Sequence, residues 1–297
     1  MAAAMTADAK RENLGYWCTG AGRADRCAVI DLSGAEPVPV SYGTLEARLD
    51  RVAAMLTAAG LGPGDRLALA MGNRVAFIEI MFGAIRAGVV PVPLNTRLDA
   101  ETLAFIVGDA DCVAAAVDPA CHPAIVRLVE DAGVARRIAL APAPPGWRDY
   151  ESALAAAPAG FTPPRLAPDH PAFQPYTSGS TGRPKGVVLT HAGQLWWVRA
   201  VQRYWPAAPD ERALVAVPLC HKNAMAGAVK PMLHAGASIV LMPRFEPVAF
   251  LEALARYRCT QAGAVPTVYA LLLQERARIA GLDLSGLRRL KMGSAPV

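Results

Sequence analysis

Lysine is scarce in this 297-residue chain, in which only five of the 30 basic residues are lysines: Lys10, Lys185, Lys222, Lys230 and Lys291. The formal net charge of +5 therefore rests on arginine. No Lys- or Arg-rich run of the kind that binds nucleic acid is present, so we expect no nucleic-acid partner.

The chain also lacks a run of 18 apolar residues, and residues 1–17 lack the apolar region of a signal peptide. Its six cysteines form no CxxC pair. The adjacent pairs Cys121-His122 and Cys220-His221 have poor geometry for binding one metal ion. We therefore expect a cytoplasmic protein with reduced thiols, no membrane span and no metal site.

What the chain does contain is an alternation of helix-like and strand-like segments. The predicted helices cover residues 41–59, 73–87, 99–107, 123–132, 191–203, 248–257 and 267–279, and the predicted strands residues 65–71, 89–92, 112–117, 137–140, 213–217, 238–242, 261–265 and 287–292. The alternation predicts an α/β protein with mostly parallel sheet, flanked by helices. The length exceeds one ordinary core, so we expect two packed lobes.

Several local features refine this prediction. Gly60, Gly88 and Gly236 are expected to end helices, whereas Asp99 and Thr190 are expected to cap helix starts. Residues 141–168 are rich in Pro and Ala and read as a spacer with one short helix near residues 149–156. In the helix after Thr190, we expect His191 to be an ordinary first-turn residue and Trp196 and Trp197 to lie in the core.

One stretch, YTSGSTGRPKGVVLTH at residues 176–191, is typical of a phosphate-binding loop. Hydroxyl or glycine residues fill every position from Thr177 to Gly182, and Lys185 follows Pro184. Such a loop lets backbone N–H groups, hydroxyls and an ammonium group approach a polyanion. The stretch matches neither Walker A nor GxGxxG, and its apolar flanks predict strands on both sides. The alternative is a surface hairpin of ordinary turn residues.

The sequence YTSGSTGRPKG resembles the signature of the AMP-forming adenylating enzymes, which include acyl-CoA synthetases, and FIEIMFGAIRAGVVPVPLN, MPRFEP and VPTVYALLL also resemble that family. The resemblance implies that ATP and a carboxylic acid give an acyl adenylate and pyrophosphate, with transfer to coenzyme A and with Mg²⁺ arriving on the nucleotide. It also implies two α/β lobes, one of about residues 61–203 and one of about 1–60 with 204–297. The ATP-binding residues that it implies are Thr177, Ser178, Gly179, Ser180, Thr181, Gly182, Lys185, Gly293, Ser294, Ala295 and Pro296.

His221 follows a predicted strand, where ligands bind in open α/β sheets. Its segment CHKNAM resembles the place where acyl-CoA synthetases carry a histidine beside the acyl group, so we expect His221 to bind the acid. No acidic residue lies between Glu211 and Glu246 to pair with a buried ammonium group, which disfavours an amino-acid substrate. The alternative is a loop histidine that serves packing alone.

The resemblance places the catalytic lysine of these enzymes in a C-terminal region beyond Val297. No catalytic residue is therefore assigned here, and we expect the chain to be the N-terminal part of a longer ligase that makes no acyl-CoA by itself. A non-catalytic nucleotide- or acyl-binding module, and an adenylation domain that serves a carrier protein, are the alternatives. The acid and the oligomeric state, including a homodimer, stay open.

Overall fold

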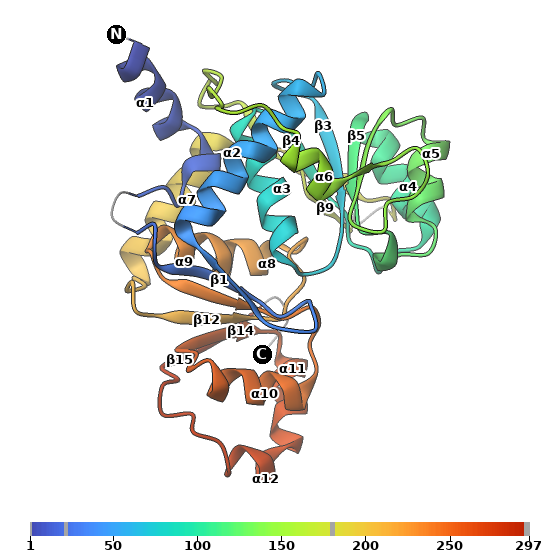
Figure 1. Cartoon of the computed structure of the whole chain (residues 1–297). Helices are drawn as coiled ribbons and strands as arrows, with labels where there is room; N and C mark the ends of the chain where they lie inside the picture. Colours follow the sequence, from blue (N-terminus) through green and yellow to red (C-terminus); the bar gives the residue numbers. More distant parts are fainter. Residues whose placement is uncertain (1, 21–22, 179–181, 294–297) are drawn as a thin grey trace. The chain divides into compact units, whose positions relative to one another are not determined.

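The computed structural model describes residues 2–20, 23–178 and 182–293. The chain forms two compact units, the first made of Met1–Trp17, Leu45–Gly72 and Ala76–Trp197, and the second of Cys18–Thr44, Asn73–Val75 and Val198–Val297. Each unit is built around its own main sheet (Figure 1).

The first unit has a five-stranded sheet, all of whose strands run parallel. Its strand order is β4 (Val90–Pro93), β3 (Arg66–Ala70), β5 (Cys112–Val117), β6 (Arg136–Ala139) and β7 (Arg148–Asp149). Its helices are α1 (Ala2–Glu12), η1 (Leu14–Tyr16), most of α2 (Tyr42–Ala58) and α3 (Val75–Arg86), α4 (Ala100–Asp109), η2 (Pro119–Cys121), α5 (Ile125–Asp131) and α6 (Tyr150–Ala155).

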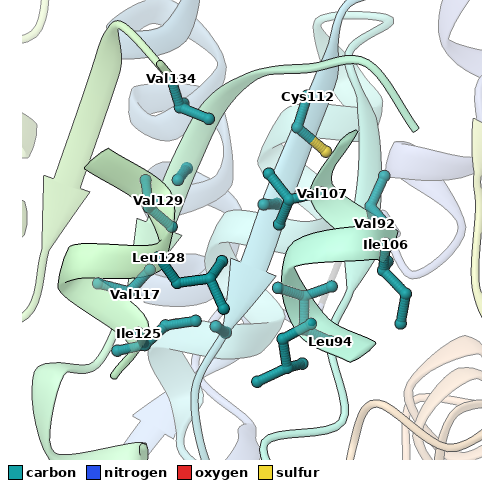
Figure 2. Packing of buried hydrophobic residues seen from close by; sticks show 14 of the residues in the cluster. Val92, Leu94, Ile106, Val107, Cys112, Val117, Ile125, Leu128, Val129 and Val134 are labelled. Carbon is teal, nitrogen blue, oxygen red and sulfur yellow. The ribbon is translucent and has the colours of Figure 1, made fainter. Parts of the chain in front are cut away.

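One core cluster of this unit lies where α4 and α5 pack on the sheet (Figure 2). Leu103 and Ile106 of α4 and Ile125 and Val129 of α5 are fully or almost fully buried against small residues of β3 and β5. Alanine on these strands lets the helices approach closely, and the apolar burial stabilises the unit. Asp99 caps α4 by accepting a hydrogen bond from the backbone N–H of Thr102, as predicted.

Helix α2 packs against α3 in the same unit. A Cβ atom on Gly83 would lie 2.5 Å from the side chain of Val52, so the close approach of the two helices requires glycine. Arg86 at the end of α3 is fully buried and pairs with Glu46 and Asp50 of α2, each at 2.6 Å. Most of α2 therefore belongs to the first unit. The sequence had led us to expect residues 1–60 in the other lobe. The exact boundaries of the two lobes stay a prediction.

The second unit has a six-stranded sheet with the order β15 (Arg289–Met292), β14 (Gln261–Ala264), β12 (Arg212–Val215), β13 (Ser238–Leu241), β1 (Cys27–Asp31) and β2 (Val38–Ser41). All neighbours are parallel except β1 and β2. Its helices are the second half of α7 (His191–Tyr204), α8 (Lys222–Ala224), the π-helical turn η3 (Met225–Val229), α9 (Lys230–His234), α10 (Pro247–Arg256), α11 (Pro266–Gln274) and α12 (Arg276–Ile279). Helices α10 and α11 lie beside this sheet (Figure 1), and their residues pack on β12, β13 and β14 in a core cluster.

The α/β class with mostly parallel sheet is confirmed, and the predicted glycine caps are correct, since Gly60, Gly88 and Gly236 have φ of 80°, 76° and 77°. Strands β1 and β2 were not predicted from the sequence. One helix was predicted over residues 267–279, but the structure divides this stretch at Glu275 into α11 and α12.

The prediction that Trp196 and Trp197 lie in the core is wrong, because they are 68% and 37% exposed. The buried side of α7 is formed instead by His191, Val198 and Val201. This spacing follows the helical period and leaves Trp196 on the opposite side of the helix and Trp197 at the edge of the buried side.

Candidate nucleotide-binding site

The segments on either side of the predicted phosphate loop form the two arms of a hairpin in the first unit. One arm contains β8 (Pro171–Phe173) and β9 (Tyr176–Thr177), and the other contains β10 (Lys185–Gly186) and β11 (Leu189–Thr190). The arms are antiparallel, and Lys185 pairs with Thr177. The prediction that the loop joins two strands is confirmed. Gly179, Ser180 and Thr181 lie outside the described residues.

Two glycines of the hairpin are required by geometry. Gly182 has a φ of 89°, which is costly for residues with a side chain, and no atom of the described residues lies within 4 Å of where its Cβ would be. A Cβ on Gly186 would lie 2.6 Å from Nε2 of Gln174 and 3.0 Å from the Tyr176 ring. Thr177, Ser178, Gly182 and Lys185 are exposed in this unit, so their donors and the ammonium group can approach a polyanion.

The hairpin rests on α4 and on β4. The hydroxyl of Tyr176 donates a hydrogen bond of 2.6 Å to the carboxylate of Asp109, and the guanidinium of Arg183 lies 5.6 Å from the ring centre of Phe105. Burial, followed by the hydrogen bond to Asp109, raises the pKa of Tyr176, so its hydroxyl stays a donor. The backbone N–H of Gln174 donates to the carbonyl of Pro91 in β4. None of these supports was identified from the sequence.

His191 has a role different from the one expected. It begins α7, as predicted, and Thr190 accepts a hydrogen bond from the N–H of Gly193 as a cap. However, the His191 ring is completely buried, and its Nδ1 accepts a hydrogen bond of 2.9 Å from the backbone N–H of Leu14. Burial, followed by the charge of His170, lowers the pKa of His191 to about 4, so the ring is neutral near pH 7.

The other expected site residues lie in the second unit. His221 precedes the first residue of α8, six positions after the end of β12, and its side chain is exposed. A buried asparagine that the sequence analysis took only as a helix start, Asn73, fixes the segment that leads to it. The Asn73 side chain donates to the carbonyls of Val217 and Met242 and accepts from the N–H of Leu219.

A cavity of about 150 Å³ lies between the carboxyl ends of the strands and the segment α8–η3. Its lining residues, all in the second unit, are Leu214, Val215, Val217, Asn223, Ala224, Gly227, Ala228, Gly263, Ala264, Lys291, Met292 and Gly293. Gly293 is thus a lining residue, whereas His221 stands two residues before the lining residue Asn223. Ser294, Ala295 and Pro296 lie outside the described residues.

Lysines of the second unit add polar groups that the sequence analysis did not assign. The ammonium group of Lys291 donates to the carbonyl of Gly227 at 3.4 Å, and burial, followed by the charge of Arg289, lowers its pKa. Lys230, in α9, is 1% exposed, and burial lowers its pKa to about 8.

The part of the chain that the structure describes contains neither a metal-binding group nor a membrane-spanning helix. No group of three His, Cys, Asp or Glu side chains there could hold a metal ion. The described hairpin residues include no carboxylate, so an Mg²⁺ ion on this hairpin would depend on the oxygens of the nucleotide. No helix in the described ranges has both the length and the hydropathy to cross a bilayer.

A family model, related sequences and solved structures all resemble this chain. The model of the family described as AMP-binding enzyme matches residues 17–297. The feruloyl-CoA synthase of Amycolatopsis sp is 36% identical over 291 residues, which are 97% of this chain and 55% of that protein. The long-chain-fatty-acid–CoA ligase FadD13 of Mycobacterium tuberculosis is 31% identical over 271 residues, which are 88% of this chain and 51% of that protein.

Among solved structures, the ATP-bound form of MatB from Rhodopseudomonas palustris superimposes with a TM-score of 0.83 at 30% identity. The match covers 96% of this chain and 55% of MatB. The chain therefore spans about half the length of the relatives that it matches.

Proposed function

The chain belongs to the AMP-binding enzyme family, and on that premise we propose that it uses ATP to convert a carboxylic acid to an acyl adenylate. Pyrophosphate leaves in this step, and the acyl group of the adenylate then passes to the thiol of coenzyme A, with release of AMP. The relatives named above are CoA ligases, and because the chain spans only about half their length, the activity of the whole protein is part of the proposal.

The observation that carries the proposal is the hairpin. It presents Lys185 and the glycine Gly182 at the end of two short antiparallel arms, and its residues 171–190 contain no acidic side chain. An exposed ammonium group without a neighbouring carboxylate in the same loop is suited to a polyphosphate. We assign the phosphate contacts to Thr177, Ser178 and Lys185, and, on their sequence alone, to Gly179, Ser180 and Thr181.

We assign the acid to the cavity beside α8 and the adenine to the segment that starts at Gly293. In this proposal His221 and Asn223 contact the acid from α8, and Lys291 is the charged group in the cavity wall. Ser294, Ala295 and Pro296 complete the adenine contacts on the evidence of the sequence. Mg²⁺ would enter with ATP and neutralise charge on the departing pyrophosphate.

The experiment is acid-dependent exchange between ATP and labelled pyrophosphate, measured with the protein in its full natural length and a panel of fatty, aromatic and small branched acids. We expect exchange with at least one acid, and formation of an acyl-CoA when coenzyme A is added. ATP binding without exchange would support the non-catalytic binding module. Transfer to a carrier protein's phosphopantetheine, and not to coenzyme A, would support the carrier-serving adenylation domain.

The assignment of His221 has its own test. In the full-length protein, His221→Ala should change the KM for the acid or the acid selectivity much more than the apparent KM for ATP. If both constants equal those of the wild type, or if only the stability falls, His221 serves packing and the assignment is wrong.

A further inference from the structure

Two histidines close the base of the candidate phosphate hairpin. His170 directly precedes β8, and His191 directly follows β11. The backbone N–H of His191 donates to the carbonyl of His170 at 3.1 Å, and that of Ala192 donates to the carbonyl of Pro168 at 2.9 Å. The rings of the two histidines are 5.8 Å apart. The start of α7 is thus continuous with the arm that carries Lys185.

The His191 side chain connects this base to a part of the chain 177 residues away. Its Nδ1 accepts the backbone N–H of Leu14, the first residue of η1, and both residues are completely buried. A hydrogen bond in such a dry environment is stronger and more directional than one at the surface. The bond therefore fixes the position of the ring relative to η1.

The segment that receives the bond, residues 13–17, is itself held firmly. The side-chain amide of Asn13 donates to the carbonyl of Arg86 at 3.0 Å, and Arg86 donates through Nε to the carbonyl of Gly15 at 2.9 Å. The ring of Trp17 stacks on Phe82 with centroids 3.7 Å apart. We call residues 13–17 the N-terminal turn. Because α3 fixes it, the N-terminal turn can serve as a rigid support for the hairpin.

The chemistry of the ring agrees with this role. Nδ1 accepts a hydrogen bond only in the unprotonated ring, and the burial that lowers the pKa of His191 keeps the ring in this state. Nε2 then carries the hydrogen, and it has no partner within the described residues. A buried donor without a partner is destabilising, so the polar contribution of this ring comes from the Nδ1 acceptor.

We propose that His191 is a positioning residue for the phosphate site: its bond to Leu14 ties the second arm of the hairpin to the N-terminal turn and thereby holds Lys185 in place. The nucleotide part of this statement rests on the proposed function. The mechanical part, that loss of the bond loosens the hairpin, does not.

Three substitutions of His191 separate this role from packing. In His191→Asn, the side-chain oxygen takes the place of Nδ1 and can accept the Leu14 N–H. In His191→Gln, the side chain is nearly as long as histidine, but its polar end takes the place of Nε2, and His191→Ala has no acceptor. The variants should be made in the full-length protein. The readouts are amide hydrogen exchange at Leu14 and Val187, whose N–H donates to Pro175 across the hairpin, and the KM and kcat for ATP in pyrophosphate exchange.

We expect exchange at both amides to rise in the Gln and Ala variants, and their KM for ATP to rise about two- to tenfold, which is the effect of one neutral hydrogen bond. Their kcat should change less, and the Asn variant should stay close to wild type in every readout. A rise at Leu14 with unchanged exchange at Val187 would overturn the inference, as would an Asn variant that behaves like Ala.

A second variant protects the test against simple misfolding. Asn13→Ala removes the bond from the N-terminal turn to Arg86 without touching the hairpin, and it should also speed exchange at Val187. In the double variant with His191→Ala it should add nothing further at Val187, because the connection is already broken. Additive effects would overturn the inference. If the wild type does not use ATP, the proposed function fails, and exchange at Val187 alone decides whether His191 positions the hairpin.

Discussion

Gly186 offers a sharp test of how the candidate phosphate hairpin is packed. Alanine at this position would place a Cβ 2.6 Å from Nε2 of Gln174, 3.0 Å from Cζ of Tyr176 and 3.2 Å from its hydroxyl oxygen. The Gln174 side chain is almost fully buried, and the Tyr176 hydroxyl is bonded to Asp109, so neither moves freely. The substitution should push the phenol away from the carboxylate and open the hairpin.

The size of the effect follows from these contacts. Overpacking at a well-packed position costs about 1–3 kcal/mol. The Tyr176–Asp109 bond adds about 1 kcal/mol or less, because both groups are partly solvated. We therefore expect Gly186→Ala to lower the free energy of unfolding by about 1–4 kcal/mol.

The assay is urea unfolding of the wild type, Gly186→Ala and the matched control Gly182→Ala. The control has backbone strain because of its φ of 89°, but its new Cβ meets no atom of the described part of the chain within 4 Å. Gln174→Ala removes the nearest obstacle, so it should recover part of the loss in Gly186→Ala, by about 1 kcal/mol, and none in Gly182→Ala. The reasoning would be refuted if Gln174→Ala restored the same amount of unfolding free energy in both glycine variants. It would also be refuted if Gly186→Ala lowered the free energy of unfolding by less than about 0.5 kcal/mol.

Two further predictions concern buried charges. Arg86→Met should destabilise the protein by about 2–4 kcal/mol in urea unfolding, because Glu46 and Asp50 lose their partner. The control Arg127→Met, at a residue that is 86% exposed, should change stability by less than about 0.5 kcal/mol. Similar losses of stability in the two variants would contradict this prediction. The pKa of Lys230 is about 8 in the folded protein and about 10.4 in the unfolded chain. Between these two pH values the unfolded state binds more protons than the folded state. The free energy of unfolding should therefore rise by about 3 kcal/mol as the pH increases from about 8 to about 10.4. The Lys230→Met variant should lack this rise in stability. If the variant shows the same dependence of stability on pH as the wild type, the prediction is wrong.

Most helices and strands could be predicted from the sequence, because the local sequence patterns agree with which side chains are buried in the fold. Apolar periodicity and glycine caps such as Gly60 and Gly88 predicted the helix–strand alternation of the first unit, and Asp99 marked the start of α4. The errors occurred where tertiary packing decides. Helix α7 buries His191 and turns Trp196 outward, because the buried side of this helix begins at the histidine, not at its largest apolar residues.

The candidate site was predicted in part. The composition of residues 177–185 marked the loop, and the structure adds the hairpin and its strand pairs. The supports Asp109 and Leu14 could not be found, since their contacts with the hairpin join residues 67 and 177 positions apart in the chain, and one of them uses a backbone N–H. Asn73 was hidden for the same reason, because it acts through backbone groups of distant segments.

The measurement that tests the central proposal most directly is the kinetics of pyrophosphate exchange by the full-length Lys185→Ala variant. We expect a decrease of about ten- to a hundredfold in kcat/KM for ATP, the effect of one charge-assisted hydrogen bond, with unchanged thermal unfolding. Lys10→Ala, which removes a lysine at the end of α1, should stay within about twofold of wild type under the same conditions. Wild-type kinetics in Lys185→Ala would contradict the assignment of this hairpin to the phosphates of ATP.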